Sequence, residues 1–136
     1  MVRVIMGDKG TGKTKKLIEL INTAASQEAG NVVCIEAEKT MTFDIHYHVR
    51  LIVAREYEIA SYEAMRGFIS GLYAGNYDIS HIFIDNLFKI VCGKSDREAE
   101  KFLDWLEHFS HVHGVRFTVS ASVDENSVTD GMQKYL

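Results

Sequence analysis

The sequence of 136 residues contains no proline, so glycine, asparagine and aspartate must provide the breaks between helices and strands. It has only two cysteines, Cys34 and Cys92, without metal-site spacing, and we interpret both as reduced thiols of a cytosolic protein. No apolar run reaches the ~18 residues that a membrane-spanning helix needs, and the N-terminus lacks the layout of a signal peptide. We therefore expect a cytoplasmic protein without a membrane partner.

An excess of positive charge is also absent. The formal net charge is -4 and the isoelectric point is about 5.8, which gives no broad electrostatic basis for binding nucleic acid. The only dense basic run is Lys13, Lys15 and Lys16. The length, with 46% hydrophobic and 25% charged residues, fits one globular domain over residues 1–136.

Apolar runs alternate along the chain with segments of helical periodicity. Strands are predicted at residues 2–6, 31–37, 50–54, 81–85 and 115–121. Helices are predicted from about residue 12 to 28, from 62 to 73 after an N-cap at Ser61, and from 95 to 113. Residues 40–48 form a loop or a helical turn, and residues 127–136 a short helix or a frayed tail. This alternation predicts an α/β protein whose mainly parallel sheet of about five strands is flanked by helices.

One glycine-rich segment lies where the first strand meets the first helix. It matches the phosphate-binding pattern G-x-x-x-x-G-K-[ST], known as Walker A, without deviation. Glycines let the backbone approach phosphate oxygens closely, and the N–H groups of the loop and helix N-terminus can bind them. We expect Lys13 to reach the β- and γ-phosphates and the Thr14 hydroxyl to ligate Mg²⁺. The predicted nucleotide-binding residues are Gly7, Asp8, Lys9, Gly10, Thr11, Gly12, Lys13 and Thr14.

A second pattern is the apolar run Ile82-Phe83-Ile84 followed by Asp85. In phosphate-loop proteins such a strand ends in an aspartate, the Walker B residue, that holds Mg²⁺. We therefore predict Thr14 and Asp85 as the metal-binding residues.

On GDKGTGKT and IFID, the sequence resembles the P-loop NTPases of the ATP-binding kind. It is similar to small single-domain bacterial members labelled ATP-binding proteins or, loosely, twitching-motility-type ATPases. The resemblance extends over nearly the whole chain and implies a three-layer P-loop NTPase core with ATP and Mg²⁺ as cofactors. It also implies a polar residue that senses the γ-phosphate, Ser120 or Ser122, of which strand alternation leaves one facing the nucleotide. A minimal core often needs a neighbour to complete its site, which leaves a homo-oligomer or a protein partner open.

The sequence departs from this family after Asp85. Many hydrolysing relatives carry a glutamate next, where Asn86 stands here, and asparagine cannot accept a proton from water. The catalytic residue is therefore unassigned, with substitute carboxylates at Glu36, Glu38, Glu56, Glu58, Asp124 and Glu125. The D-x-x-G and N-K-x-D patterns of GTP-binding proteins are missing, which favours ATP as the nucleotide.

The arginines and histidines are less specific candidates for functional residues. Nothing in the sequence distinguishes an arginine finger among Arg50, Arg55, Arg66, Arg97 and Arg116. A zinc site is not expected from His46, His48, His108, His111 and His113, because zinc requires convergent ligands with supporting hydrogen bonds.

The preferred functional hypothesis is an Mg-ATP-binding protein with weak or partner-dependent ATPase activity. The alternatives are an ATP-dependent switch that does not hydrolyse, motivated by Asn86, and a small-molecule kinase, for which the chain is short. A nucleic-acid-dependent motor is the least favoured hypothesis, because the net negative charge disfavours binding to nucleic acid.

Overall fold

The computed structural model describes residues 1–7, 12–39, 44–93, 95–122 and 127–136. Its strands are β1 (Val2–Gly7), β2 (Asn31–Glu36), β3 (Arg50–Val53), β4 (Ile79–Ile84) and β5 (Arg116–Ser122). Its helices are α1 (Lys13–Gln27), the 3₁₀ turn η1 (Ala54–Tyr57), α2 (Tyr62–Gly75), α3 (Leu87–Ile90), α4 (Asp96–His113) and α5 (Asp130–Gln133).

The five strands form one parallel sheet in the order β1-β5-β4-β2-β3. The predicted α/β class and strand count are confirmed, and the sheet is parallel throughout. In such a sheet the carboxyl ends of all strands meet at one edge. The order places β5 between β1 and β4, so the segments that follow β1 and β4 flank the end of β5.

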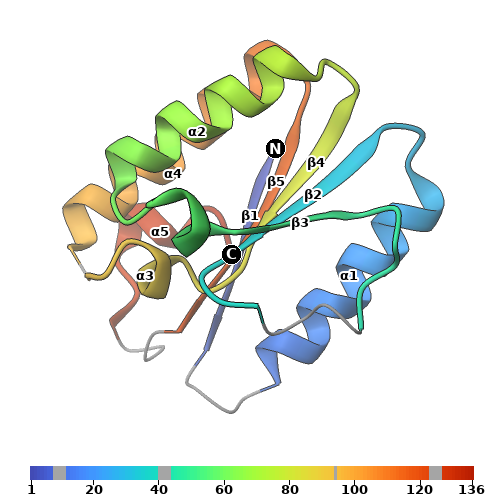
Figure 1. Ribbon diagram of the computed structural model, residues 1–136. Coiled ribbons are helices and arrows are strands. Elements are labelled where there is room, and N and C mark those ends of the chain that lie inside the picture. The colour runs from blue at the N-terminus through green and yellow to red at the C-terminus, as the bar shows by residue number, and fades with distance from the viewer. Residues whose placement is uncertain (8–11, 40–43, 94, 123–126) are drawn as a thin grey trace.

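Helices cover both faces of this sheet. Figure 1 shows α2 and α4 on one side of the strands and α1 on the other. Successive side chains of β2 point to opposite faces of the sheet. Val33 and Ile35 belong to the core under α2 and α4. Val32 and Cys34 join the smaller core with α1. Burial on both faces explains why the strand sequences are nearly continuous apolar runs.

Polar caps fix the ends of the two long helices on the α2 and α4 face. The Ser61 hydroxyl accepts a hydrogen bond from the Ala64 N–H at 3.0 Å, and the Ser95 hydroxyl accepts one from the Glu98 N–H at 3.3 Å. Gly114 ends α4 in the left-handed conformation, with φ of 73°, which glycine adopts without strain. The predicted N-cap at Ser61 and the predicted end of the last long helix at residue 113 are confirmed.

The structure differs from the sequence predictions mainly at element boundaries. The third strand ends one residue early because the chain turns into η1, while β4 begins two residues before the predicted start and β5 is shifted by one. Helix α3 was not predicted, because four residues are too few to establish a helical period. Residues 40–43 of the predicted loop or turn lie outside the described residues. None of the helices in the described parts of the chain is long and apolar enough to cross a membrane.

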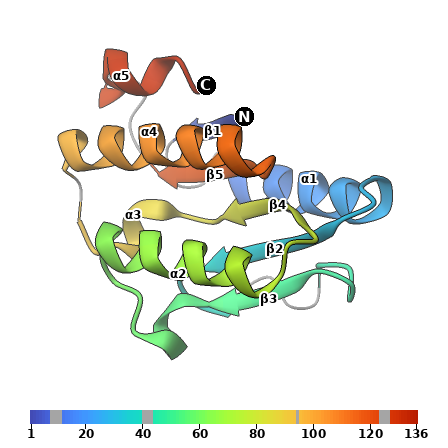
Figure 2. The same cartoon turned by 90° about the horizontal axis from the view of Figure 1, so that it is seen from above.

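The C-terminal segment covers the outer edge of β1. The Val4 N–H donates to the Tyr135 carbonyl at 2.7 Å, and the Val2 N–H donates to a Glu107 carboxylate oxygen at 2.9 Å. Figure 2 shows α5 and the chain end next to β1 and α4. Of the two alternatives for residues 127–136, the short helix is present, and it blocks an edge that could otherwise pair with another chain.

Candidate phosphate and metal site

The Walker A segment begins in β1 and ends in α1. Gly7 is the last residue of β1, and Gly12 caps α1 with φ of 84°, a left-handed conformation that favours glycine. Lys13 and Thr14 are the first two residues of α1. The predicted contacts of Asp8, Lys9, Gly10 and Thr11 lie outside the described residues. The N-terminus of α1, which is the positive end of its helix dipole, therefore lies at the carboxyl edge of the sheet.

A pocket of about 430 Å³ opens at this point. Three elements supply its walls: the start of α1, the segment after β4, and the end of β5. Its lining residues include Gly12, Lys13, Thr14, Asp85, Asn86, Ser120 and Ser122. Two sequence motifs that are far apart in the chain thus meet around one cavity.

Ser120 connects the ends of β5 and β4. Its hydroxyl donates to Asp85 Oδ1 at 2.9 Å and accepts from the Asn86 N–H at 2.8 Å. The expectation that only one of Ser120 and Ser122 faces this side is wrong, because both line the pocket. Residues two apart on a strand point to the same face. Ser120 is distinguished by its bond to the carboxylate.

Asp85 lies in an unfavourable electrostatic environment. Burial raises the pKa of its carboxyl, and nearby Glu36 raises it further, while the bond from Ser120 and the charges of Lys13 and Lys89 act in the opposite direction. Glu36, at the end of neighbouring β2, is 1% exposed. The two carboxyl groups thus interact unfavourably at the ends of neighbouring strands, and a cation bound at Asp85 would relieve this repulsion.

Backbone conformation accounts for the asparagine that follows Asp85. Asn86 has φ of 55°, in the left-handed region where asparagine is one of the few non-glycine residues commonly found. Its N–H is oriented towards Ser120. The left-handed backbone accounts for asparagine at this turn, and because its amide cannot accept a proton from water, a general base would have to come from another element.

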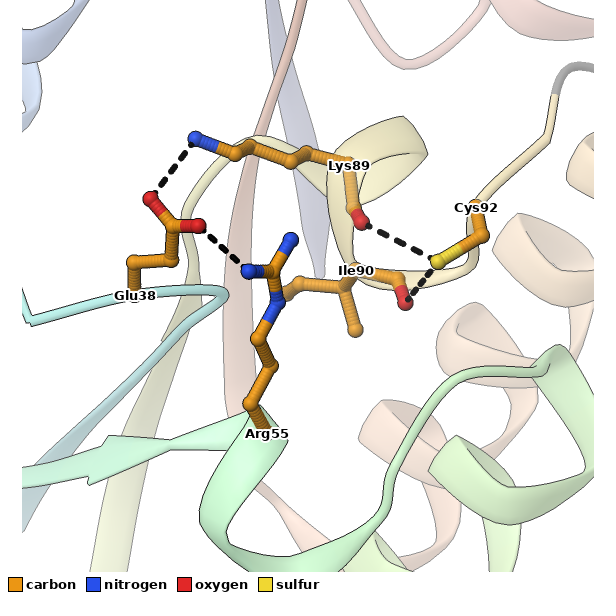
Figure 3. A network of polar contacts seen from close by, with 5 residues as sticks. All are labelled: Glu38, Arg55, Lys89, Ile90 and Cys92. Atoms are coloured by element: carbon orange, nitrogen blue, oxygen red, sulfur yellow. Dashed lines mark hydrogen bonds and ion pairs between the residues drawn. The ribbon is translucent and has the colours of Figure 1, made fainter.

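Glu38 is held by two cations from different elements. Arg55 Nη1 lies 2.5 Å from Glu38 Oε1, and Lys89 Nζ lies 3.2 Å from Oε2 (Figure 3). The Lys89 hydrogen bond, followed by the charges of Arg55 and Lys89, lowers the pKa of the Glu38 carboxyl. Glu38 therefore joins the ends of β2 and β3 to α3, and Arg55 is engaged by it.

The remaining candidates are spread over the molecule. Glu56 and Glu58 are exposed in and after η1, and Asp124 and Glu125 lie outside the described residues. Arg66 lies 5.9 Å from the centre of the Phe102 ring. The other positions are Arg50 on β3, Arg97 on α4, Arg116 at the start of β5, His46 and His48 before β3, and His108, His111 and His113 on α4. Within the described residues, no three His, Cys, Asp or Glu side chains form a metal-holding group.

The comparisons with known proteins identify no relative. No family model matches the sequence, and no curated protein matches it. The assignment of this site therefore depends on its own residues and their geometry.

Proposed function

We propose that this protein binds Mg-ATP in the pocket at the carboxyl edge of the sheet and hydrolyses it slowly or with the help of a partner. The observation that supports this proposal is the convergence of Lys13 and Thr14 with Asp85 around one cavity of about 430 Å³. The Walker A sequence supplies the chemical specificity for phosphate.

The donor set of the pocket fits Mg²⁺ bound to a triphosphate. Mg²⁺ takes oxygen ligands and is usually held by one or two protein groups together with phosphates and water. The Thr14 hydroxyl and the Asp85 carboxylate would be the protein ligands, and Lys13 would pair with the phosphate charge. When bound, the ion would neutralise charge on the phosphates. Ser120 would hold Asp85 in place through its hydrogen bond.

Among the carboxylates that the structure describes, Glu36 is our candidate for activating water. It ends β2, the strand beside β4, and the Asp85 N–H donates to the Ile35 carbonyl at 2.8 Å. This bond fixes the backbones of residues 35 and 85 next to each other, so Glu36 at the end of β2 is close to Asp85, the proposed metal ligand. A carboxylate in that position can accept the proton of a water attacking the γ-phosphate. Glu38 is less suited, because Arg55 and Lys89 already engage it.

Binding is tested by calorimetric titration of Mg-ATP into the wild type and Lys13→Ala. We expect the variant to bind at least about tenfold more weakly, since it loses a charge-assisted contact worth roughly 1.5–3 kcal/mol. Lys15→Ala is the matched control, because Lys15 is exposed on α1 and is absent from the pocket lining. Equal affinity in the wild type and Lys13→Ala would refute the proposed site.

Hydrolysis is tested separately in single-turnover assays of Glu36→Gln. Loss of a general base is expected to reduce the rate by about 10²–10⁴-fold, with Mg-ATP affinity retained. Glu58→Gln removes an exposed carboxylate that lines neither the Asp85 pocket nor the pocket that Glu36 lines and should leave the rate unchanged. If the wild type binds Mg-ATP but shows no turnover alone or at high protein concentration, the non-hydrolysing switch is the better description.

A second cavity favours phosphotransfer as the alternative chemistry. Glu36 also lines a pocket of about 450 Å³ together with Lys39, Tyr47 and Arg50. An acceptor hydroxyl bound there could transfer its proton to Glu36. The test is ADP release in the presence of a panel of small alcohols and sugars, and stimulation by one of them that Glu36→Gln abolishes would support a kinase over an ATPase.

We also propose a cytoplasmic location. Cys34 is buried and Cys92 exposed, and both are free thiols. An exposed free thiol is typical of a reducing compartment.

A further inference from the structure

A separate pocket of about 390 Å³ lies at the amino end of the sheet, between the last turns of α1 and the strands β1, β4 and β5. Leu20, Ala24 and Phe83 supply apolar surface. The polar lining comes from Arg3, Thr23, Gln27, Glu28, His81, Arg116 and Thr118. Its volume lies within the range of small-molecule sites, which are about 300–1,000 Å³.

A chain of hydrogen bonds crosses one wall of this pocket. Glu28 Oε2 lies 2.8 Å from His81 Nδ1 and 2.7 Å from an Arg116 nitrogen, and Glu28 Oε1 accepts from the Ser80 hydroxyl at 2.9 Å. On the other side of the imidazole, Nε2 lies 2.8 Å from the Thr118 hydroxyl. The Glu28 and His81 side chains are only 11% and 12% exposed. The carboxylate of Glu28 is thus matched by one guanidinium and two further donors.

Arg3 differs from Arg116 in its electrostatic surroundings. It lies beside Thr118 in the register of β1 and β5, on the face that carries the pocket. Among the described residues Arg3 forms no ion pair, whereas Arg116 is paired with Glu28. The pocket therefore combines apolar surface from α1 and β4 with a surplus guanidinium.

We propose that this pocket binds a small organic anion. Its apolar body would pack against Leu20, Ala24 and Phe83, and its carboxylate or phosphate group would bond to Arg3 and to the exposed half of Arg116, whose side chain is 50% exposed. Arginine is suited to this because its planar group recognises an acid group through two parallel hydrogen bonds. The site is independent of the ATP proposal, since its lining residues differ from those of the Asp85 pocket, and His81 lies in the first half of β4 whereas Asp85 follows its carboxyl end.

The test is a titration of the ¹⁵N-labelled protein with indole-3-acetate, followed by amide resonances. A chain of 15.4 kDa gives resolved spectra. We expect the amides of Arg3, His81, Arg116 and Thr118 to shift together, at the millimolar concentrations that a small probe requires. Indole-3-acetamide has the same body without the charge and should bind about two- to fivefold more weakly, since the loss is that of a partly exposed charge pair.

Variants identify the residue responsible. Arg3→Gln should weaken the binding of indole-3-acetate by a factor of about two to five, and Arg3→Lys, which keeps the charge, should retain most of the affinity. Arg97→Gln makes the same charge change at an exposed position on α4 and should bind as the wild type does. The proposal is overturned if the acetate causes no shifts around the pocket, if the acetamide binds equally well, or if Arg3→Gln has unchanged affinity.

Discussion

The Ser120 hydroxyl donates a hydrogen bond of 2.9 Å to Asp85 Oδ1, which ties the end of β5 to the end of β4. The same oxygen accepts from the Asn86 N–H at 2.8 Å. Both the position and the ionisation of Asp85 therefore depend on a residue of a different strand.

Replacing Ser120 by alanine should disturb both properties. The variant leaves the partly buried Asn86 N–H without its acceptor, which costs roughly 1 kcal/mol of unfolding free energy. It also removes an interaction that lowers the pKa of Asp85, so that pKa should rise further. Urea denaturation and ¹³C-carboxyl titration by NMR measure the two effects. Ser122→Ala, on the same face of β5, should change neither, and equal effects at both serines would contradict the assigned role.

The ionised carboxyl of Asp85 should lower the unfolding free energy at neutral pH. Burial, with Glu36 adding to it, raises the pKa of its carboxyl above the ordinary 3.8. An acid with a raised folded-state pKa stabilises the fold fully only below its unfolded pKa, and that contribution is lost as the pH rises through the folded value. Asp85→Asn, which can still accept from Ser120, should therefore have a higher melting temperature than the wild type at pH 7.

The difference in melting temperature should shrink as the pH falls below Asp85's ordinary pKa of 3.8, where the wild-type carboxyl is protonated in both states. The same substitution should weaken Mg-ATP binding, because the proposed site uses the charge of Asp85. A wild type that is more stable than Asp85→Asn at pH 7 would show that the carboxylate is already neutralised in the free protein.

Local patterns in the sequence were sufficient to predict the α/β class, the sheet and the two halves of the candidate site. Each strand carries an apolar run, and the Walker A segment and Asp85 are recognisable within a few residues. Glu36 could not be separated from the other carboxylates, because its position beside Asp85 depends on β2 pairing with β4. Strand order is set by packing of the whole chain, and no short segment encodes it.

The pocket at the amino end of the sheet was missed for the same reason. Its hydrogen bonds join residues 53 and 37 positions apart, from Glu28 to His81 and from His81 to Thr118. In the sequence, His81 and Thr118 are polar residues within mostly apolar strands, and no local pattern connects them. Only the pairing of β4 with β5 and the position of the α1 C-terminus bring the three side chains together.

His81 should make stability depend on pH in the mildly acidic range. Burial lowers the pKa of its imidazole below the ordinary 6.5, although Glu28 partly offsets the effect. At this position the unfolded chain binds a proton more readily than the folded one. The neutral imidazole therefore contributes its full stabilisation of the fold above pH 6.5, and this stabilisation is lost as the pH falls through the folded-state pKa. We expect the unfolding free energy from urea titrations to decrease between pH 7.5 and pH 5.

His81→Gln should flatten that decrease, since the variant has no titrating group at the position. His111→Gln removes an exposed histidine of α4 and should leave the slope as it is in the wild type. A slope that persists unchanged in His81→Gln would assign the pH dependence to another group.

Gly30 brings the end of α1 close enough to β4 for Glu28 to contact Ser80 and His81. A Cβ atom at Gly30 would lie 2.6 Å from both the Asp78 carbonyl oxygen and the Ser80 Cβ, closer than atoms can approach without displacement. Gly30→Ala should therefore reduce the unfolding free energy by about 1–3 kcal/mol, the usual cost of overpacking.

The control for Gly30→Ala is the same substitution at Gly67, in the interior of α2, where a Cβ would meet no atom within 4 Å. There alanine should stabilise the protein by roughly 0.5–1 kcal/mol, because glycine loses more backbone freedom in a helix. The two changes are chemically identical, so opposite signs in urea denaturation would isolate the close approach at Gly30 from helix propensity. If both variants gained stability, the contact between the chain at Gly30 and β4 would be looser than the structure has it.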